Sequence, residues 1–197
     1  MEDNLKGDPS MIVTKFGGSS LADASQFKKV RNILLENTDR RYVVPSAPGK
    51  RHPKDDKITD LLYLCHDAAS RGQNFHAHLE RIRARYEEIA SELGVAIDFS
   101  EDFAVIADRF AKGASRDYAA SRGEYLNGKL LSAYLGFDFV DAADVVRFDA
   151  EGHLLENETN ALLSARLAQH KCAVIPGFYG AEESGSIHTF SRGGSDI

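Results

Sequence analysis

The amino-acid sequence predicts an α/β fold built around a mainly parallel sheet. Two runs rich in β-branched and aromatic residues, 12–14 and 41–45, have the composition of strands, and we expect the first to be buried. Between them, apolar side chains recur at helical spacing at Phe27, Val30 and Leu34. A strand, a helix and a strand in this order form a βαβ unit, whose strands lie parallel. Ligands bind at the carboxyl ends of such strands, so the turns that follow both runs should be neighbours at a binding site.

The turn after the first strand, residues 15–20 with the sequence Lys-Phe-Gly-Gly-Ser-Ser, is a candidate phosphate site. Its paired glycines can take backbone angles closed to other residues and let the main chain approach a ligand. A helix follows, with Asp23 or Ser25 available to cap its start. Free backbone N–H groups and a helix N-terminus attract oxyanions, and Lys15 adds a positive charge. Taken alone, the same pattern also fits an ordinary connection between a strand and a helix.

The composition is that of one substantial globular domain. Among 197 residues, 43% are hydrophobic and 27% are charged. The net charge of −6 argues against a broad nucleic-acid surface, so phosphate recognition would need a local cluster. Neither a membrane-spanning run nor a signal-peptide pattern is present, so we expect a cytoplasmic protein with no membrane partner. Cys65 and Cys172 lie in apolar segments and read as small buried hydrophobes rather than a disulfide.

The first ten residues differ from the rest of the chain. Residues 1–10 are polar and unpatterned, and Met11 directly precedes the first strand. We expect 1–10 to be a flexible leader and 11–197 to hold the folded part.

The second turn and the helix after it supply two more candidate residues. Ser46 lies in a turn rich in Ser, Pro and Gly. Residues 50–57 follow as a solvated, mobile loop, because Val44 and Arg51 replace the glycine and the hydroxyl residue that a P-loop requires. A helix is expected from Ile58 to about Ser70. Thr59, in its first turn, is either a plain N-terminal polar residue or a hydroxyl offered to a substrate.

The stretch from about 75 to 115 reads as a helical arm. Apolar residues from Leu79 to Leu93 and from Phe103 to Phe110 form two amphipathic faces, and the Arg and Glu residues between them read as a solvated surface. His76 and His78 are two residues apart, which points them in different directions on a helix and argues against a metal pair. We expect no metal site formed by the protein itself.

The remaining segments contain the rest of the predicted elements. A helix opening at residues 121–127 carries Glu124, which is either a surface acid near a helix start or a carboxylate aimed into a site. Further expected elements are strands at 137–141 and 145–148, a helix at 157–170, a buried strand at 172–175 ending in a glycine-rich turn at 176–180, and part of a hairpin at 185–190. A second glycine pair at 192–196 forms another turn suited to anions.

Three motifs in this order resemble the aspartate kinases, members of the amino-acid kinase superfamily: Lys-Phe-Gly-Gly-Ser-Ser at 15–20, Ser-Arg-Gly-Glu at 121–124 and Arg-Gly-Gly-Ser-Asp at 192–196. The resemblance extends from residue 12 to the last residue. It implies a three-layer α/β/α sandwich around a mainly parallel sheet. It also implies transfer of the γ-phosphoryl of MgATP to the side-chain carboxylate of L-aspartate, as the first step of lysine, threonine and methionine biosynthesis, in a homo-oligomer such as a dimer.

The resemblance also implies roles for individual residues. Lys15 would hold the transferring phosphoryl oxygens, and Asp196 would orient Lys15 and the transfer site. Arg192 suits a substrate carboxylate because its guanidinium is a planar, two-pronged donor, and Glu124 suits the substrate ammonium. The remaining aspartate-binding residues would be Thr59, Phe178 and Ser195, and the remaining nucleotide-binding residues would be Gly17, Gly18, Ser19, Ser46 and Gly194.

The sequence departs from the family pattern at its last residues. Aspartate kinases continue past the Gly-Gly-Ser-Asp turn into a half that supplies most adenine contacts, followed by regulatory ACT domains. We therefore expect residues 11–197 to be the N-terminal portion of the catalytic domain, inactive alone. Two alternatives stay open: another superfamily kinase, acting on glutamate, acetylglutamate, carbamate or UMP, and a non-catalytic module that binds or assembles with another chain.

Overall fold

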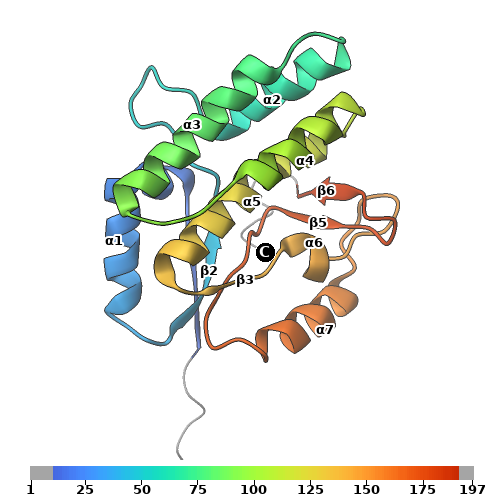
Figure 1. Ribbon diagram of the computed structural model, residues 1–197. Coiled ribbons are helices and arrows are strands. Elements are labelled where there is room, and N and C mark those ends of the chain that lie inside the picture. The colour runs from blue at the N-terminus through green and yellow to red at the C-terminus, as the bar shows by residue number, and fades with distance from the viewer. Residues whose placement is uncertain (1–10, 191–197) are drawn as a thin grey trace, which may run out of the picture.

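The structure is a computed structural model that describes residues 11–190 (Figure 1). The expected leader at 1–10 and the second glycine turn, within 191–197, lie outside the described residues. In chain order the elements are β1 (Ile12–Phe16), the 3-10 helix η1 (Gly18–Leu21), α1 (Ala24–Leu35), β2 (Arg40–Pro45), α2 (Ile58–Ser70), α3 (His76–Leu93), α4 (Ser100–Ala111), α5 (Arg116–Leu135), β3 (Asp138–Phe139), α6 (Ala142–Val145), α7 (Glu156–Leu167), β4 (Ala173–Val174), β5 (Tyr179–Ala181) and β6 (Ile187–Thr189).

The main sheet is parallel, as the sequence predicts. Its strand order is β1-β2-β4-β3, and each neighbouring pair runs in the same direction. β5 and β6 form a separate antiparallel hairpin, which matches the hairpin expected near the end of the described chain. The predicted α/β class is therefore confirmed.

One face of the sheet is covered by helices α1 to α5. Val43 and Val174 point from the two central strands into a core that these helices share, and both are fully buried. α5 contacts β2, β3 and β4, while α2 and α3 pack against α5 from the outside (Figure 1). We call this the helical face.

The opposite face carries α6 and α7. Tyr42, Ala173 and Ile175 point toward this side and pack with Leu163 and Leu167 of α7. The Tyr42 hydroxyl donates a hydrogen bond to the carbonyl oxygen of Leu167, with an O–O distance of 3.1 Å. We call this the α7 face. Helices, sheet and helices therefore form three layers, as the family resemblance implies.

The prediction that the first strand is buried was wrong. The side chain exposure of β1 alternates along the strand, and Val13 keeps 60% of its surface exposed. Among the described residues β1 pairs only with β2, at one edge of the sheet. A β-branched run marks a strand but carries no information about whether both of its sides are covered.

The helix after the first turn begins directly after Asp23, one of its two predicted caps. α1 starts at Ala24, and Asp23 caps it by accepting a hydrogen bond from the Gln26 N–H at 3.0 Å. Between the glycines and α1 lies the short 3-10 helix η1. The α1 N-terminus is therefore occupied by the Asp23 carboxylate, and the glycine turn offers its own backbone instead.

Two expected elements have different bounds in the structure. α5 begins at Arg116, where the Ser115 hydroxyl accepts a hydrogen bond from the Tyr118 N–H, so residues 121–127 lie in the middle of the helix and not at its start. The segment 145–148 is not a strand: α6 ends at Val145, and the next residues form only isolated bridges. Glu124 therefore lies too far from the start of α5 to be stabilised by the helix dipole there.

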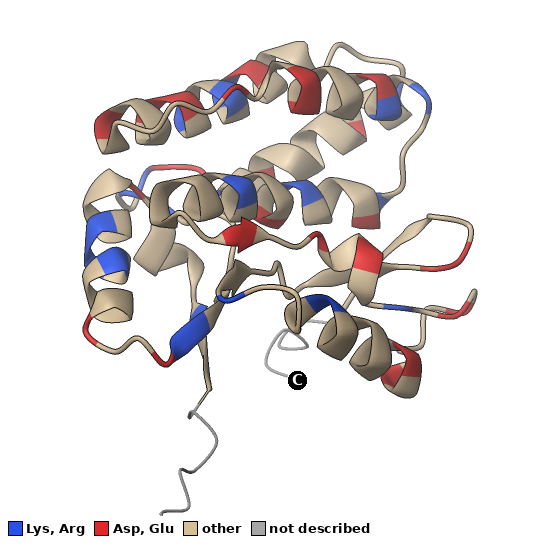
Figure 2. Cartoon of the chain, turned by 60° about the horizontal axis from the view of Figure 1, so that its bottom comes forward, with Lys and Arg blue, Asp and Glu red and all other residues tan. Residues whose placement is uncertain are grey.

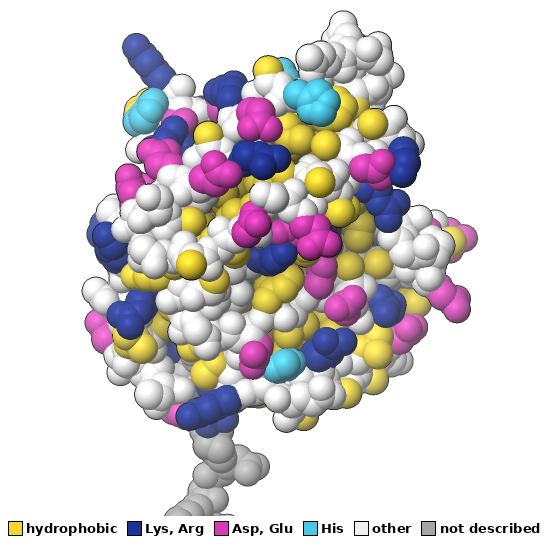
Figure 3. Space-filling model, viewed as in Figure 1, with side chains coloured by type: hydrophobic (Ala, Val, Ile, Leu, Met, Phe, Trp, Pro, Cys, Tyr) yellow, Lys and Arg dark blue, Asp and Glu magenta, His cyan; other side chains and the backbone are white. Residues whose placement is uncertain are grey.

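Charge is mixed over the surface. Figure 2 shows Lys and Arg next to Asp and Glu along the ribbons, and Figure 3 shows both signs interspersed with apolar atoms over one face. Within residues 11–190, none of the helices has both the length and the apolar content needed to cross a bilayer.

Candidate functional site

A hollow of about 550 Å³ lies beyond the carboxyl ends of β1 and β2. Its lining comes from the η1 turn, from the loop that joins β2 to α2, from the start of α2, from α5 and from the segment before β5. The lining residues are Gly18, Ser19, Ser46, Ala47, Pro48, Gly49, Lys50, Lys57, Thr59, Ala120, Glu124 and Phe178. Six of the predicted site residues therefore gather here: Gly18, Ser19, Ser46, Thr59, Glu124 and Phe178.

The two turns are neighbours, as predicted from the βαβ unit. The Ser46 N–H donates to the Phe16 carbonyl oxygen at 2.9 Å, and the Gly49 N–H donates to the Gly18 carbonyl oxygen at 2.8 Å. These backbone contacts join the loop after β2 to the loop after β1 at the edge of the hollow.

Of the two glycines of the first turn, Gly18 is required by close contact with another segment, whereas Gly17 meets no steric limit within the described residues. Gly17 has an extended conformation, with φ at −71°, which any residue can adopt. A Cβ on Gly18 would come within 2.7 Å of the Ala47 carbonyl oxygen, closer than real Cβ contacts allow. Gly18 therefore permits the close approach of the second turn, and backbone angle plays no part.

Helix α5 forms the floor under the second turn. A Cβ on Gly123 would lie 2.8 Å from the Ala47 Cβ, so the absence of a side chain lets the loop rest on the helix. One turn further along, the Asn127 amide donates to the Ser46 carbonyl oxygen at 2.6 Å, and Asn127 is fully buried. Together Gly123 and Asn127 fix the height and register of the loop that carries Ser46.

Glu124 is a buried carboxyl group directed into the hollow. It retains 8% of its exposed surface, and its Oε2 accepts a hydrogen bond from the Phe178 N–H at 3.0 Å. Burial raises the pKa of Glu124 to about 7, against the opposing effects of the Phe178 and Gly177 N–H groups and the positive charge of Lys15. A cation bound beside this group would favour the ionised form. The reading of Glu124 as a surface acid is therefore wrong.

The rest of the hollow is electropositive. α2 begins at its edge, and the N-cap residue Lys57 makes no side-chain capping hydrogen bond within the described chain. The Thr59 hydroxyl lies in the first turn of this helix, and Lys50 and Lys57 both line the hollow. An uncapped helix N-terminus and two ammonium groups favour an anionic ligand.

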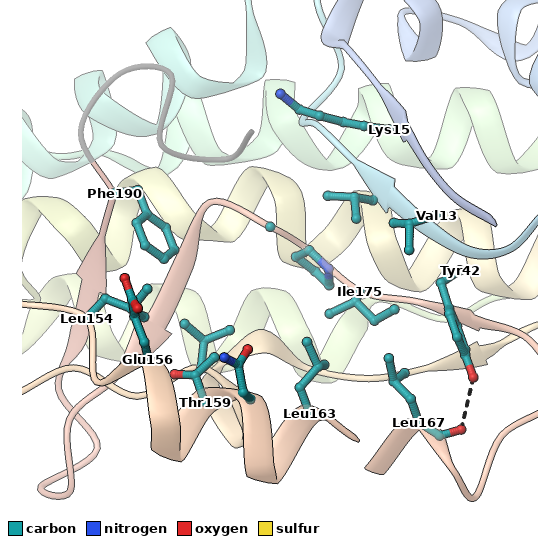
Figure 4. A pocket seen from close by; sticks show the side chains of 15 residues that line it. Val13, Lys15, Tyr42, Leu154, Glu156, Thr159, Leu163, Leu167, Ile175 and Phe190 are labelled. Carbon is teal, nitrogen blue, oxygen red and sulfur yellow. Dashed lines mark hydrogen bonds between the residues drawn. The ribbon is translucent and has the colours of Figure 1, made fainter. Parts of the chain in front are cut away.

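Lys15 approaches from the α7 face. In the register of the sheet it pairs with Val44, and it lines a second cavity of about 660 Å³ rather than the hollow. Figure 4 shows its ammonium at the upper border of that cavity, directed away from α7. The positive charge of Lys15 lowers the pKa of the Glu124 carboxyl group, which opposes the effect of burial. Lys15 therefore stands at the boundary between the two spaces.

The second cavity separates the sheet from α7 and is largely apolar. Val13, Tyr42, Ile175, Leu163 and Phe190 contribute to its walls (Figure 4). Apart from Lys15, no predicted site residue among the described ones lines it. The described part of the chain leaves this face of the sheet incompletely covered near β1.

The loop at 50–57 is largely exposed, as expected, and ion pairs link it to α3. Arg51 donates from Nε to Asp55 Oδ2 at 2.9 Å, and Arg85 of α3 donates to the same oxygen at 2.8 Å. Hydrogen bonds from Arg51, and secondarily from Arg85, hold the pKa of Asp55 well below its usual range. Arg85 is itself buried, so the arm helices do not present a purely solvated set of charges.

Several predicted residues lie outside the described residues: Arg192, Gly194, Ser195 and Asp196. Gly17 is described but does not line the hollow. Asn127, Lys50 and Lys57 contribute to the site but were not predicted from the sequence. A polar residue inside an apolar helix face was the available signal for Asn127, whereas nothing in the sequence separates the two lysines from other surface lysines.

One group of side chains within residues 11–190 could hold a metal ion. Asp149, Glu151 and His153 bring ligand atoms within 4.8 Å of one another. All three follow the isolated bridge at Phe148, and none lines the hollow. Two of the three are exposed, and His153 already pairs with Asp149, so the group reads as a surface turn.

Comparisons with known proteins agree with the α/β fold described above. The model of the amino acid kinase family matches residues 10–197. Aspartokinase 3 of Bacillus subtilis is 35% identical to the chain over 201 residues, which cover 95% of this chain and 44% of the relative.

Two solved structures are also similar. The crystal structure of Clostridium acetobutylicum aspartate kinase matches with a TM-score of 0.91 and 49% identity, over 95% of this chain and 43% of that one. E. coli aspartokinase III in complex with aspartate and ADP matches with a TM-score of 0.73 and 26% identity, over 94% of this chain and 44% of that one. The chain thus spans less than half the length of these relatives.

Proposed function

The chain belongs to the amino acid kinase family, and from this premise we propose that it forms the aspartate-binding part of an aspartate kinase. The reaction is transfer of the γ-phosphoryl group of MgATP to the β-carboxylate of L-aspartate. One observation carries the proposal: a buried carboxyl group, Glu124, is the one carboxylate among the described residues that line a hollow at the ends of two parallel strands, together with two lysines. This arrangement suits a ligand that is anionic overall and has one ammonium.

The chemistry demands positioning and neutralisation of charge. An oxygen of the β-carboxylate attacks the γ-phosphorus, the bond from that phosphorus to the bridging oxygen of ADP breaks, and an acyl phosphate forms. The attacking group is already ionised, so no proton needs to leave it. Catalysis then rests on holding the reactants in line and on countering the charge of the phosphoryl oxygens.

The described residues divide between the two substrates. We assign the phosphoryl oxygens to Lys15 and the phosphate-facing backbone to Gly17 and Gly18, with Ser19 and Ser46 beside them. The substrate ammonium is assigned to Glu124, which is buried and accepts one backbone hydrogen bond.

The aspartate pocket is completed by residues from other elements. Thr59 and Phe178 contribute from the start of α2 and from the segment before β5. Arg192, Ser195, Gly194 and Asp196 keep the roles that the family resemblance implies.

Magnesium enters this proposal as part of the substrate MgATP. Among the described lining residues, Glu124 is the one carboxylate, and the Phe178 N–H already engages it. Mg²⁺ prefers oxygen ligands, retains several water molecules and is commonly held by substrate phosphates. The hollow therefore fits a metal that arrives on the triphosphate.

Calorimetric titration tests the assignment of substrate. L-Aspartate is titrated into the protein with and without MgADP, next to L-glutamate, N-acetylglutamate, carbamoyl phosphate as a carbamate surrogate, and UMP. We expect heat of binding for aspartate and, in the complete product of the gene, formation of ADP that depends on aspartate. Binding of glutamate, acetylglutamate or UMP in preference to aspartate would assign the chain to another branch of the family.

The remaining assignments concern the location, the metabolic role and the oligomeric state of the protein. We propose a cytoplasmic, biosynthetic enzyme that assembles as a dimer. Light scattering on the complete gene product checks the dimer, and a purely monomeric particle at working concentration contradicts it.

A further inference from the structure

Arg85 is a buried cation that leaves its own helix to contact two other segments. It lies on α3, whose apolar side chains pack in the core of the helical face, and it retains 5% of its exposed surface. One terminal nitrogen donates to Asp55 Oδ2 at 2.8 Å. The other donates to the carbonyl oxygens of Ala22 at 2.6 Å and Gly49 at 3.0 Å.

Both backbone acceptors belong to the borders of the hollow. Gly49 lines it directly, and Ala22 ends the turn that carries Gly18 and Ser19. These two segments already meet through the hydrogen bond from Gly49 to Gly18. The Arg85 guanidinium donates a hydrogen bond to each of the same two segments, so a single side chain of α3 links both backbone turns.

Asp55 extends the same anchor along the loop. It accepts hydrogen bonds from the Arg51 side chain and from Arg85, and its own side chain is 11% exposed. Between Gly49 and α2, the loop carries Lys50 and Lys57, the two lysines that line the hollow. The contacts of Asp55 therefore restrict the positions that Lys50 and Lys57 can take at the border of the hollow.

A buried guanidinium is a costly way to pack a helix. An apolar side chain of similar size at position 85, with another at position 55, would fill the space without desolvating charges, and such replacement of a whole buried pair is often neutral or stabilising. What the apolar side chain lacks is a planar set of donors that fixes the relative position of three acceptors. The contacts of Arg85 point to geometry, rather than packing, as its role.

We propose that Arg85 is a positioning residue through which the helical arm sets the separation of the two turns that bind substrate. The proposal rests on the proposed function, because the turns matter only if they hold phosphate and aspartate. It assigns a purpose to α3, which contributes no lining residue to the hollow among those described.

The test compares variants of α3 in the complete gene product. R85M removes the donors and keeps much of the volume, while R85K keeps the charge but cannot contact all three acceptors. R81M is the matched control: Arg81 lies one turn earlier on the same helix and contacts the loop only through an exposed ion pair with Asp56, and exposed pairs of this kind contribute little. Readouts are KM for each substrate, kcat, melting temperature and hydrogen exchange at residues 18–22 and 46–56.

We expect R85M to raise KM for at least one substrate about tenfold with a smaller change in kcat, because misplacing binding groups by about 1 Å has large effects. Exchange at both segments should rise, R85K should be intermediate and R81M should match the wild type. R85K covers the case in which R85M fails to fold. Wild-type kinetics in a folded R85M or R85K would overturn the role of Arg85 and leave the proposed function intact. A wild-type protein that neither binds nor phosphorylates aspartate would overturn both.

Discussion

The two faces of the sheet differ in how completely they are covered. On the helical face, Val43 is fully buried under α1 to α5, whereas on the α7 face Val13 is 60% exposed next to a cavity of about 660 Å³. The candidate site contains residues from both the covered and the exposed face of the sheet. Glu124 rises from the closed helical face, and Lys15 extends from the open face. Under the proposed assignments, the group for the substrate ammonium is therefore buried in the closed face, and the group for the phosphoryl oxygens lies on the less covered face.

The largest expected effect comes from the carboxyl group on the closed side. E124Q should weaken aspartate binding by about 100-fold, because it removes the charge that pairs with a buried ammonium. In the wild type, Glu124 must be ionised to bind the ammonium, so affinity should fall about tenfold per pH unit below its pKa of about 7. Calorimetry between about pH 5.5 and 8.5 measures both effects.

The stability of the wild type should depend on pH through Glu124, and E124Q tests this dependence. Because burial raises the pKa of Glu124 from 4.5 to about 7, its neutral form stabilises the fold fully below about pH 4.5, and this contribution is lost as pH rises through 7. E124Q should remove that dependence, which is on the order of 3 kcal/mol between those limits. E92Q, an exposed change on α3, is the control. If E124Q and E92Q show the same pH profile as the wild type, Glu124 is not buried as described.

A pair of valines tests the difference in coverage directly. V43A should destabilise the protein by roughly 2 to 3 kcal/mol, because it leaves a cavity under five helices. V13A, on the neighbouring strand, should cost less than about 0.5 kcal/mol because its side chain is mostly exposed. Urea unfolding gives both values, and equal losses would mean that β1 is covered on both sides in solution.

A pair of glycines tests how closely the second turn rests on α5. G123A should lower stability by about 1 kcal/mol, since the crowding against Ala47 outweighs the better helix propensity of alanine. It should also weaken ligand binding by displacing the loop of Ser46. G17A should leave stability unchanged, because a Cβ there would meet no described atom within 4 Å. Thermal melts and the aspartate titration measure both variants, and a stable G123A with unchanged affinity would contradict the close contact.

The smallest expected effect concerns the two thiols. Burial raises the pKa of Cys65 to about 12, so this residue should stay unreactive in the native state. Cys172, which precedes β4 and is half-buried, should react slowly with a thiol reagent. The native protein should therefore titrate as one accessible thiol and the denatured protein as two. Equal reactivity of both in the native protein would indicate that the helical core opens readily.

The sequence predicts the order of elements well because strand and helix periodicities are local. The βαβ unit, the helices at 58–70 and 75–115 and the final hairpin all follow from spacing. The exposure of β1 could not be predicted, because it depends on what lies beside the strand. The start of α5 was misjudged because Ser115, a clear cap in the structure, precedes a stretch with little apolar periodicity.

The candidate site was less accessible to residue patterns alone. Ser46 was expected near a ligand because turns after parallel strands meet, but the readings of Thr59 and Glu124 stayed divided, and burial decided that of Glu124. Arg85 and Asn127 were missed because each is an ordinary polar residue of a helix. Their importance arises from backbone carbonyls that are distant in sequence.

The spatial order of the strands also governs how the chain can fold during synthesis. β2 pairs on one side with β1, which lies one helix away, but on the other side Tyr42 must meet Ala173 across the whole helical region. Such non-local parallel pairing is slow, because the entropy of closing a long loop must be overcome first. Helices α2 to α5 contact one another and can associate while the ribosome is still translating the later strands. The wall of the site that α5 provides would then exist before β4 arrives to close the sheet.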